Sequence, residues 1–523
     1  MNGDEQVPAH PEWHAPFNPW LIAVVTTMST FMEVLDTTIV NVALPHIAGN
    51  LGADVNDSTW VLTSYLVANA IILPLSAWFS SLMGRANFYL TCVGLFTLSS
   101  FLCGLAPSLG LLVFFRLMQG VGGGGLQPIT QAILIDTFPP RQRGMSMAVF
   151  GMTVVAAPII GPTLGGWITD NYSWRWIFFI NIPIGLLSLV LARKLITDPP
   201  YLPRRYGPDR FRTDYIGLGL LCLGLGSVQL VLDLGERYDW LNSQFIATFA
   251  VVAAVALTVA VFWELRHKDP ILNIRLLGER NLGSSAVIML IFGGVLYGST
   301  VALTLFMQTL LGYTSLESGL ALSPGGIVTL FMLPFIGVML SRMDARLLIT
   351  AGMVIIGCAM LYMAHYSLLV DFRRPMLGRV VQGFGMAFIF VPVNATAYNF
   401  VAKEARNAAS SLINVARNIG GSIGIAFTTA LVSRGSQVHQ TYLVSHLTPY
   451  NVAYTETLNQ TTQLIASQTG DSTTAAMQAQ TMIYGMVRQQ AATMAFADVF
   501  LVLAIASAAI LPFVWIMRRG HAA

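Results

Sequence analysis

The sequence predicts an all-α membrane protein that crosses the bilayer fourteen times. Of its 523 residues, 55% are hydrophobic and only 10% are charged, whereas a soluble domain carries about 25% charged residues. Long apolar segments recur along the whole chain, near the ~20 residues that a helix needs to span ~30 Å of hydrocarbon. The pattern Arg-x-x-Gln-Gly at Arg116 also returns at Arg379, 263 residues later. These observations predict two related bundles of membrane helices.

Hydropathy gives fourteen candidate membrane helices, most of them joined by short polar loops. Short loops make consecutive helices antiparallel neighbours. The candidate helices span residues 20–45, 57–80, 88–106, 109–136, 145–168, 175–194, 214–234, 243–265, 283–311, 318–341, 346–366, 375–401, 406–433 and 492–517.

The repeat divides these helices into two sets of six with two additional helices between them. Parallel repeats of this kind place a substrate path at the interface between the halves. The expected parts are a tail at 1–19, an N-terminal six-helix bundle at 20–194, two inserted helices at 214–265 and a C-terminal six-helix bundle at 283–517.

A polar segment at 434–491 interrupts the second bundle. It is rich in Gln and Thr, and polar loops of this length are usually functional or disordered. Within it, residues 455–467 and 475–490 have helical character. We expect a long loop outside the membrane.

Basic residues predict the orientation. If the N-terminus is cytoplasmic, nineteen of the 28 Lys and Arg residues fall in cytoplasmic loops and six in outer loops. Lys and Arg concentrate on the cytoplasmic side of membrane proteins, so we expect both termini to be cytoplasmic. The first 19 residues contain no Lys or Arg, so we expect an uncleaved first helix rather than a signal peptide.

Two carboxylates, Glu33 and Asp36, lie within the first apolar segment. A charge near the bilayer centre costs at least ~2.5–3.5 kcal/mol on insertion scales, so an ionisable residue there indicates a function. The i, i+3 spacing places both on one helix face, where two carboxyl groups in a low dielectric favour sharing a proton. This pattern favours a proton-handling site. The alternative is a pair of acids satisfied by neighbouring polar groups.

Arg116 is the expected partner of Asp36. By helical rise, Arg116 lies about 11 Å and Asp36 about 13 Å below the same face of the membrane. A buried arginine without an acid is costly, so the matching depths predict an ion pair. The alternative is that Arg116 only contacts backbone carbonyls.

A glycine-rich motif, GPTLGG, occupies the fifth candidate helix at Gly161, Pro162, Gly165 and Gly166. Glycines four residues apart permit close helix contact, and proline bends a helix. The motif is consistent with a gating hinge and equally with packing alone.

Several classes of function are excluded. The GVGGGG run at Gly120 fits a dinucleotide fingerprint only formally, because that fingerprint needs a preceding strand. None of the three lysines follows a glycine, which excludes ATP hydrolysis within this chain. The histidines lie in tails, loops or helix ends, and the four cysteines lie in apolar segments. We expect no metal, no cofactor, no catalytic residues and no nucleic-acid partner.

Five motifs in combination resemble those of the fourteen-helix drug:proton antiporters of the major facilitator superfamily, and most closely the EmrB-type permeases. The resemblance covers nearly the whole chain. It is carried by LDTTIVNVALP from Leu35 to Pro45, Arg116-x-x-Gln119-Gly120, GPTLGG, WRWIFFINIP from Trp174 to Pro183, and NVARNIGGSIG from Asn414 to Gly424.

One motif departs from the family pattern. The loop after the second helix resembles G-x-L-a-D-r-x-G-r, but it reads AWFSSLMGR here, with Ser81 in place of the acid. This replacement puts in doubt the family's charge lock between this loop and neighbouring helices, such as one that involves Asp136 or Arg141.

The resemblance implies the major facilitator fold and proton-coupled export of varied hydrophobic drugs by alternating access, driven by the proton gradient without a cofactor. Asp36, assisted by Glu33, would bind the proton, and Arg116 would respond to its charge. A dedicated exporter of one metabolite or siderophore, and a membrane-embedded enzyme, are the alternatives. Candidate substrate contacts in a central cavity are Tyr65, Asn69, Gln127, Gln131, Tyr297, Gln308, Asn394 and Asn414.

The resemblance also implies a location and partners. EmrB-type permeases work in the bacterial inner membrane with a periplasmic adaptor (a membrane fusion protein) and an outer-membrane channel. We therefore expect a multi-pass inner-membrane protein with such partners, and we expect segment 434–491 to contribute to adaptor docking.

Overall fold

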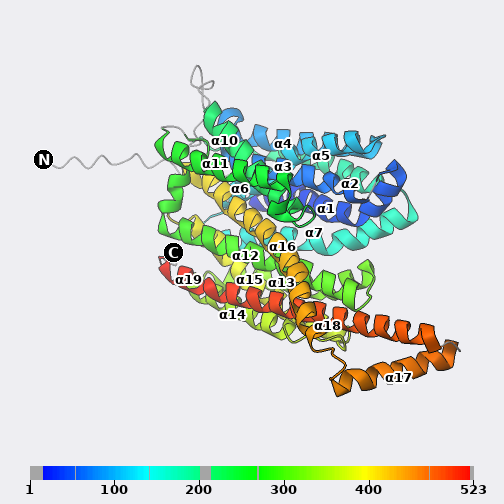
Figure 1. Cartoon of the computed structure of the whole chain (residues 1–523). Coiled ribbons are helices and arrows are strands. Elements are labelled where there is room, and N and C mark those ends of the chain that lie inside the picture. The colour runs from blue at the N-terminus through cyan, green and yellow to red at the C-terminus, as the bar shows by residue number, and fades with distance from the viewer. Residues whose placement is uncertain are drawn as a thin grey trace.

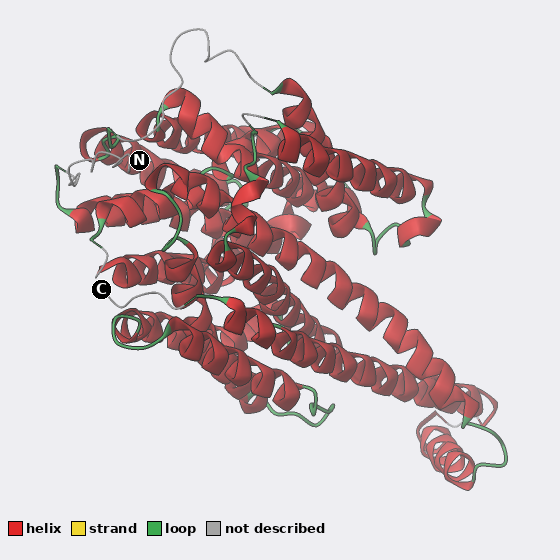
Figure 2. Cartoon of the chain, turned by 90° about the vertical axis from the view of Figure 1, so that its left-hand side faces the viewer, coloured by secondary structure: helices red, strands yellow, loops and turns green. Residues whose placement is uncertain are grey.

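The structure is a computed structural model that describes residues 16–53, 55–139, 142–200, 214–267, 270–469 and 472–518. Throughout these ranges the regular structure is helical, without a strand (Figure 2). Fourteen of the helices are long and apolar enough to cross a membrane. The predicted fold class, an all-α protein with fourteen membrane-spanning helices, is confirmed. Most of the expected tail lies outside the described residues.

The helices of the N-terminal half begin with a 33-residue helix that carries both acids. They are α1 (Pro19–Leu51), α2 (Val55–Ser58), α3 (Trp60–Met83), α4 (Arg85–Leu105), α5 (Leu109–Gly123), α6 (Leu126–Thr137), α7 (Arg143–Asn171), α8 (Trp176–Phe179) and α9 (Asn181–Leu195).

Two helices follow that pack on each other, α10 (Tyr215–Leu234) and α11 (Gln244–Arg266). The C-terminal half then comprises α12 (Arg280–Leu305), which ends in a π-helical turn at Phe306–Leu310, α13 (Ser315–Met339), α14 (Ala345–Met363), α15 (Arg373–Ala397), α16 (Arg406–Ser445), α17 (Val452–Thr469), α18 (Ser472–Ala509) and α19 (Leu511–Ile516).

The two halves lie side by side, with α1–α9 (blue to cyan) in the upper part of Figure 1 and most of α12–α19 below them. They meet where α7 packs on α13 and where α16 packs on α3 and α6. Residues related by the repeat contact each other between the halves, since Gln131 Nε2 donates to Asn394 Oδ1 at 3.4 Å across a separation of 263 residues. α10 packs on α3 and on α16, and so contacts both halves.

The glycine run in the fourth candidate helix serves packing. A Cβ atom at Gly120 would lie 2.4 Å from the Tyr65 carbonyl oxygen of α3, and one at Gly122 would lie 2.6 Å from the Phe96 backbone nitrogen of α4. Any side chain at these positions would separate the helices. The run therefore allows α5 to fit closely between α3 and α4.

Segment 434–491 is mostly helical: the two stretches with expected helical character, 455–467 and 475–490, lie within α17 and α18, and helix also covers residues 434–445, where none was expected. α16 continues to Ser445 and spans 40 residues, about 60 Å at the usual rise. α18 begins at Ser472, and α17 packs against it. The ends of α16 and α18 project from the bundle together with α17 (Figures 1 and 2). We call residues 434–491 the helical extension, the end of the bundle from which it projects the extension end, and the opposite end the terminal end.

Candidate functional site

Asp36 and Arg116 form a buried ion pair in the N-terminal half. Arg116 Nη1 donates to Asp36 Oδ2 at 2.5 Å, and the side chains of both residues are fully buried. Arg116 Nε also donates to the Val61 carbonyl at 3.0 Å, and the guanidinium lies 4.3 Å from the centre of the Tyr65 ring. Matching depths in the sequence predict this contact, and the structure brings the two residues together.

Two amides complete the surroundings of Asp36. Gln119 Nε2 and Asn181 Nδ2 donate to Asp36 Oδ1 at 3.0 and 2.9 Å. Gln119 Oε1 accepts from Arg116 Nη1 at 2.8 Å, and Asn181 also donates to Ser100. The Asp36 carboxylate is thus held by hydrogen bonds from two amides and one guanidinium.

The C-terminal half repeats this frame without the acid. Gln382 Nε2 donates to Ser299 Oγ at 2.7 Å, and Ser299 lies 263 residues after Asp36. Arg379, the counterpart of Arg116, donates to Gln382 and to Thr300. A hydroxyl stands where the first half has a carboxylate, so a titratable acid is present in only one of the two copies.

Glu33 faces a different environment from Asp36. Its carboxylate accepts hydrogen bonds from Tyr65 at 3.3 Å, Asn69 at 3.3 Å and Gln127 at 2.8 Å. Glu33 also lines a cavity between the halves, whereas Asp36 does not. In this conformation Glu33 is the carboxylate of the pair that a ligand or solvent in the cavity reaches.

The cavity has a volume of about 580 Å³ and is bounded by α1, α3, α6, α7, α10, α12 and α16. It reaches the α2–α3 and α10–α11 connections at the extension end, where Thr59, Glu236 and Arg237 lie on its wall. Apolar side chains such as Leu62 and Ile425 alternate with polar ones. Of the predicted substrate contacts, Tyr65, Asn69, Gln127 and Tyr297 line it.

The other predicted contacts lie elsewhere. Gln131, Asn394 and Asn414 are fully buried nearer the terminal end, where Asn414 Nδ2 and Ser410 Oγ donate to Gln131 Oε1 at 2.7 and 3.1 Å. Gln308 lies in the π-helical turn after α12, away from the cavity wall. The structure places these four residues outside this cavity. Their role as substrate contacts stays a prediction.

Tyr398 belongs to the same buried network. Its hydroxyl donates to Gln131 Oε1 at 3.2 Å, and burial raises the pKa of this hydroxyl above its usual range. The group therefore keeps its proton and its donor role at ordinary pH. The network closes the terminal side of the cavity with neutral groups from both halves.

A charged lock closes the terminal end itself. Asp136 at the end of α6 accepts from Arg85 of α4 at 2.7 Å and from Arg406 of α16 at 2.6 Å. The side chains of Asp136, Arg85 and Arg406 are 1%, 2% and 8% exposed. Because Arg406 belongs to the C-terminal half, this lock joins the halves even though Ser81 replaces the family's acid. Arg141, the other residue named for such a lock, lies outside the described residues.

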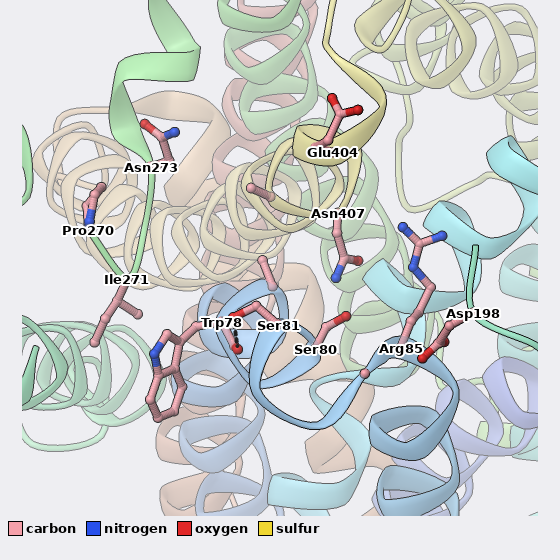
Figure 3. Close-up of a pocket in the computed structure, with 13 residues that line it drawn as sticks. Trp78, Ser80, Ser81, Arg85, Asp198, Pro270, Ile271, Asn273, Glu404 and Asn407 are labelled. Atoms are coloured by element: carbon pink, nitrogen blue, oxygen red, sulfur yellow. Dashed lines mark hydrogen bonds between the residues drawn. The ribbon is translucent and has the colours of Figure 1, made fainter. Parts of the chain in front are cut away.

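A small pocket of about 150 Å³ lies beside this lock (Figure 3). Ser81 donates to the Trp78 carbonyl at 2.7 Å and makes no ion pair. Within the described structure, Arg85 Nε and Nη2 have no hydrogen-bond partner. Asn407 of the C-terminal half lies near Arg85 in the view of Figure 3. Asp198 and Glu404 line the same pocket, so acids are present beside Arg85 although position 81 is a serine.

The glycine motif of α7 packs on α1 directly beside the two acids. A Cβ atom at Gly161 would lie 2.1 Å from Thr38 Oγ1, and one at Gly165 would lie 3.2 Å from the Ile39 carbonyl. Gly166 approaches Val42, and the side chain of Pro162 lies outside the described part. These contacts establish close packing, and the hinge function stays a prediction.

Sequence reasoning missed two charged residues of the site. Arg417 of α16 donates to Gln127 and to Asn414. Asp233 of α10 lines the cavity and accepts from Thr63. An aspartate at the end of an apolar helix was the available signal for Asp233. The inserted helices were not considered as part of the cavity wall, because the substrate path was expected between the two six-helix halves.

Comparison with known proteins gives consistent results. The Major Facilitator Superfamily model matches residues 26–425. The Multidrug export protein EmrB of Escherichia coli K12 is 37% identical over 82% of this chain and 83% of its own length. The Fatty acid resistance protein FarB of Neisseria gonorrhoeae is 37% identical over 94% of each chain. The Colistin resistance protein EmrB of Acinetobacter baumannii is 30% identical over 94% of this chain and 95% of its own.

Solved structures show the same fold. The human organic anion transporter TETRAN superposes with a TM-score of 0.58 at 13% identity, covering 94% of this chain and all of that one. The proton:xylose symporter XylE gives 0.59 at 12% identity over 95% of both. The proteins that this chain matches are transporters rather than enzymes. The matches therefore identify a multi-pass membrane transporter. The chain belongs to the major facilitator superfamily, in the group of the EmrB-type multidrug export proteins.

Proposed function

We propose that this protein exports structurally varied hydrophobic compounds in exchange for protons. The observation that supports this most is the position of Glu33, a carboxylate on the wall of a membrane-embedded cavity, one helical turn from the buried Asp36–Arg116 pair. Proton exchange requires a carboxylate that faces the transport path, here Glu33. It also requires that the second carboxylate, Asp36, be charge-compensated inside the membrane, which Arg116 provides. No cofactor takes part, because the proton gradient supplies the energy, ~2.3 kcal/mol per proton at 100 mV.

The conformation fits one state of an alternating-access cycle. With the orientation expected from the basic residues, the terminal end is cytoplasmic and the extension end is outside. The cavity reaches the extension end, while Asp136 and Arg406 join the halves at the terminal end. This is the outward-facing state, in which a drug leaves and a proton arrives.

Varied substrates are favoured over a single metabolite or siderophore by the wall of the cavity. Tyr65, Tyr297 and several aliphatic side chains give it an adaptable apolar surface, and Glu33 and Asp233 add negative charge. Such a surface suits lipophilic compounds, some of them cationic. The names of the relatives, which mention multidrug export, fatty acids and colistin, also favour breadth.

Partner proteins are proposed on the resemblance and on the helical extension. The extension exposes large apolar side chains, among them Leu464 at 58% and Met477 at 66%. Exposed apolar surface outside a membrane bundle marks a contact site. We propose that a periplasmic adaptor binds here, that an outer-membrane channel completes the assembly, and that the permease resides in the bacterial inner membrane.

Proton release on addition of drug tests the proposed function. Purified protein in weakly buffered detergent solution, titrated with hydrophobic drugs, is expected to release protons, since drug and proton compete for one cavity. The exchange should saturate with drug concentration and should be absent for Glu33→Gln, Asp36→Asn double variants. Saturable drug binding with no proton release would contradict proton exchange, and release with only one compound of a varied panel would favour the dedicated exporter.

A further inference from the structure

Three side chains form a continuous contact from one half of the molecule to the other at the inner wall of the cavity. Gln127 Nε2 donates to Glu33 Oε2 at 2.8 Å, and Arg417 Nη2 donates to Gln127 Oε1. Glu33 and Gln127 belong to α1 and α6 of the N-terminal half, and Arg417 belongs to α16 of the C-terminal half. One amide therefore connects a carboxylate in one half to a guanidinium in the other.

Arg417 lacks a carboxylate partner of its own in the described structure. It is 3% exposed, its other side-chain partner is Asn414 Oδ1 at 2.9 Å, and its Nε has no partner among the described atoms. A buried guanidinium is costly without a compensating charge. The contact through Gln127 leads to Glu33, which supplies that charge.

We propose that Arg417 senses the protonation state of Glu33 through Gln127, and that this contact holds the terminal end closed while Glu33 is charged. The proposal rests on the proposed proton exchange and names the residues that transmit it. Arg417 is a positioning residue here, since it acts through Gln127 and does not bind the proton.

The chemistry of the amide gives the mechanism. A charged carboxylate only accepts hydrogen bonds, so it orients the NH₂ group of Gln127 toward Glu33 and the carbonyl oxygen toward Arg417. When Glu33 takes a proton from water in the cavity, the new O–H group needs an acceptor. The Gln127 amide accepts this hydrogen bond when it rotates so that its oxygen faces Glu33. Its NH₂ group then faces Arg417, whose guanidinium can only donate hydrogen bonds. The contact between the halves is lost, and no bond other than the new O–H forms.

The other groups around Glu33 do not offer this path. Tyr65 and Asn69 donate to Glu33 Oε1 from α3, within the same half. Asp36 is balanced by Arg116 at 2.5 Å. The other acids on the wall are Asp233 and Glu236: Asp233 of α10 accepts from Thr63 in the N-terminal half, and Glu236 accepts from Trp240 in the α10–α11 connection. Among the described contacts of Glu33, the one through Gln127 reaches the C-terminal half.

The test measures the conformation of the terminal end without transport. Spin labels are placed at Asn87 and Met343, exposed residues at this end of opposite halves, after the four native cysteines are replaced. In lipid nanodiscs, the distance between the two labels is long when the terminal end is open and short when it is closed. Lowering the pH from 8 to 5 is expected to raise the ratio of the open to the closed population about tenfold, a typical magnitude for coupling between two sites. Glu33→Gln, Gln127→Leu and Arg417→Gln should each reduce this response to less than about twofold. Combining Glu33→Gln with Arg417→Gln should have no further effect.

Two further variants make the result specific. Arg417→Lys retains the positive charge and should retain a pH response. Arg379→Gln removes a partly buried arginine of the C-terminal half that contacts Thr300 and Gln382, and it should respond as the unmodified protein does. A full pH response in Arg417→Gln, or an equal loss in Arg379→Gln, would overturn the proposal. The proposed function is tested separately by drug-dependent proton release. That result is independent of the distances measured between the spin labels.

Discussion

Gln131 and Asn394 occupy equivalent positions of the two repeats and contact each other at 3.4 Å between the halves. Both are fully buried at the terminal side of the cavity, close to Asn414 and Tyr398. The place where the repeats meet is therefore a seal made of neutral amides. A seal of this kind opens by exchanging hydrogen-bond partners, so the charged residues on either side of it determine when it opens.

Replacing Asp36 with Asn should abolish proton-driven export and leave the protein folded. Asn retains an acceptor oxygen for Arg116 but removes the charge, and Ser299 shows that the same frame is compatible with a neutral residue. Unfolding should become easier by about 3–5 kcal/mol at most, because a buried arginine loses its acid. Drug transport into proteoliposomes under a pH gradient measures the effect, with thermal unfolding as the control. Full transport by the folded variant would refute the role of Asp36.

Removing Arg406 should open the terminal end. Arg406→Gln deletes the contact with Asp136 that joins the halves, while the Arg85 contact within one half remains. Losing one partner of a buried charge pair costs about 2–5 kcal/mol, which predicts at least a tenfold rise in the open population. A cysteine at Ser76, which is buried against Ser411 in the interface, should then react faster with a maleimide.

A matched control for that labelling is Arg342→Gln, which removes an exposed arginine at the same end. It should leave the labelling rate of the Ser76 cysteine unchanged. Equal rates in the Arg406 variant and the unmodified protein would show that the lock does not hold the halves together.

Asp233 should favour cationic substrates. Its carboxylate lies on the cavity wall contributed by inserted helix α10, where a charge pair at an effective dielectric of 20 is worth about 4 kcal/mol at 4 Å. Asp233→Asn is expected to reduce export of cationic dyes about tenfold and to leave export of neutral compounds within about twofold. Asp239→Asn, in the adjacent connection and off the cavity wall, is the control with the same loss of charge. An equal reduction for neutral and cationic compounds would refute charge recognition.

Deleting residues 440–485 and bridging the ends with a short Gly-Ser linker tests the helical extension. If the extension docks the adaptor, co-purification of the adaptor should be lost while the isolated permease still releases protons on drug addition. If the extension instead caps the cavity, adaptor binding should persist and the drug response should change. Unchanged affinity for the adaptor would rule out docking at this segment.

The sequence predicted the buried ion pair because the depths of Asp36 and Arg116 could be counted along two helices. It could not predict that Glu33 faces the cavity while Asp36 is buried away from it. An i, i+3 spacing places both residues on one helix face, and the positions of the neighbouring helices determine which of them lines the cavity. Gln131, Asn394 and Asn414 were expected in the cavity because they are polar residues in membrane helices. Their burial depends on which end is closed, which is a property of the conformation.

The helical extension shows a different limit. Its polar composition placed it outside the membrane and indicated helix only at 455–467 and 475–490, because hydropathy reports only whether a segment enters the membrane. Ten of the sixteen residues at 475–490 are Ala, Gln or Met, which are strong helix formers. α16 and α18 therefore continue as helices past the apolar stretches on which the predicted boundaries were based.

Ser299 gives the duplicated architecture an electrical asymmetry. Each copy keeps an arginine and a glutamine in the same frame, but only the first copy can gain or lose a proton there. A proton that arrives from outside therefore changes the net charge of one half and leaves its twin unaltered. The two halves therefore share one framework but differ in charge: when a proton binds at this position, only the N-terminal half changes its charge, and with it the electrostatic energy of that half in the membrane potential.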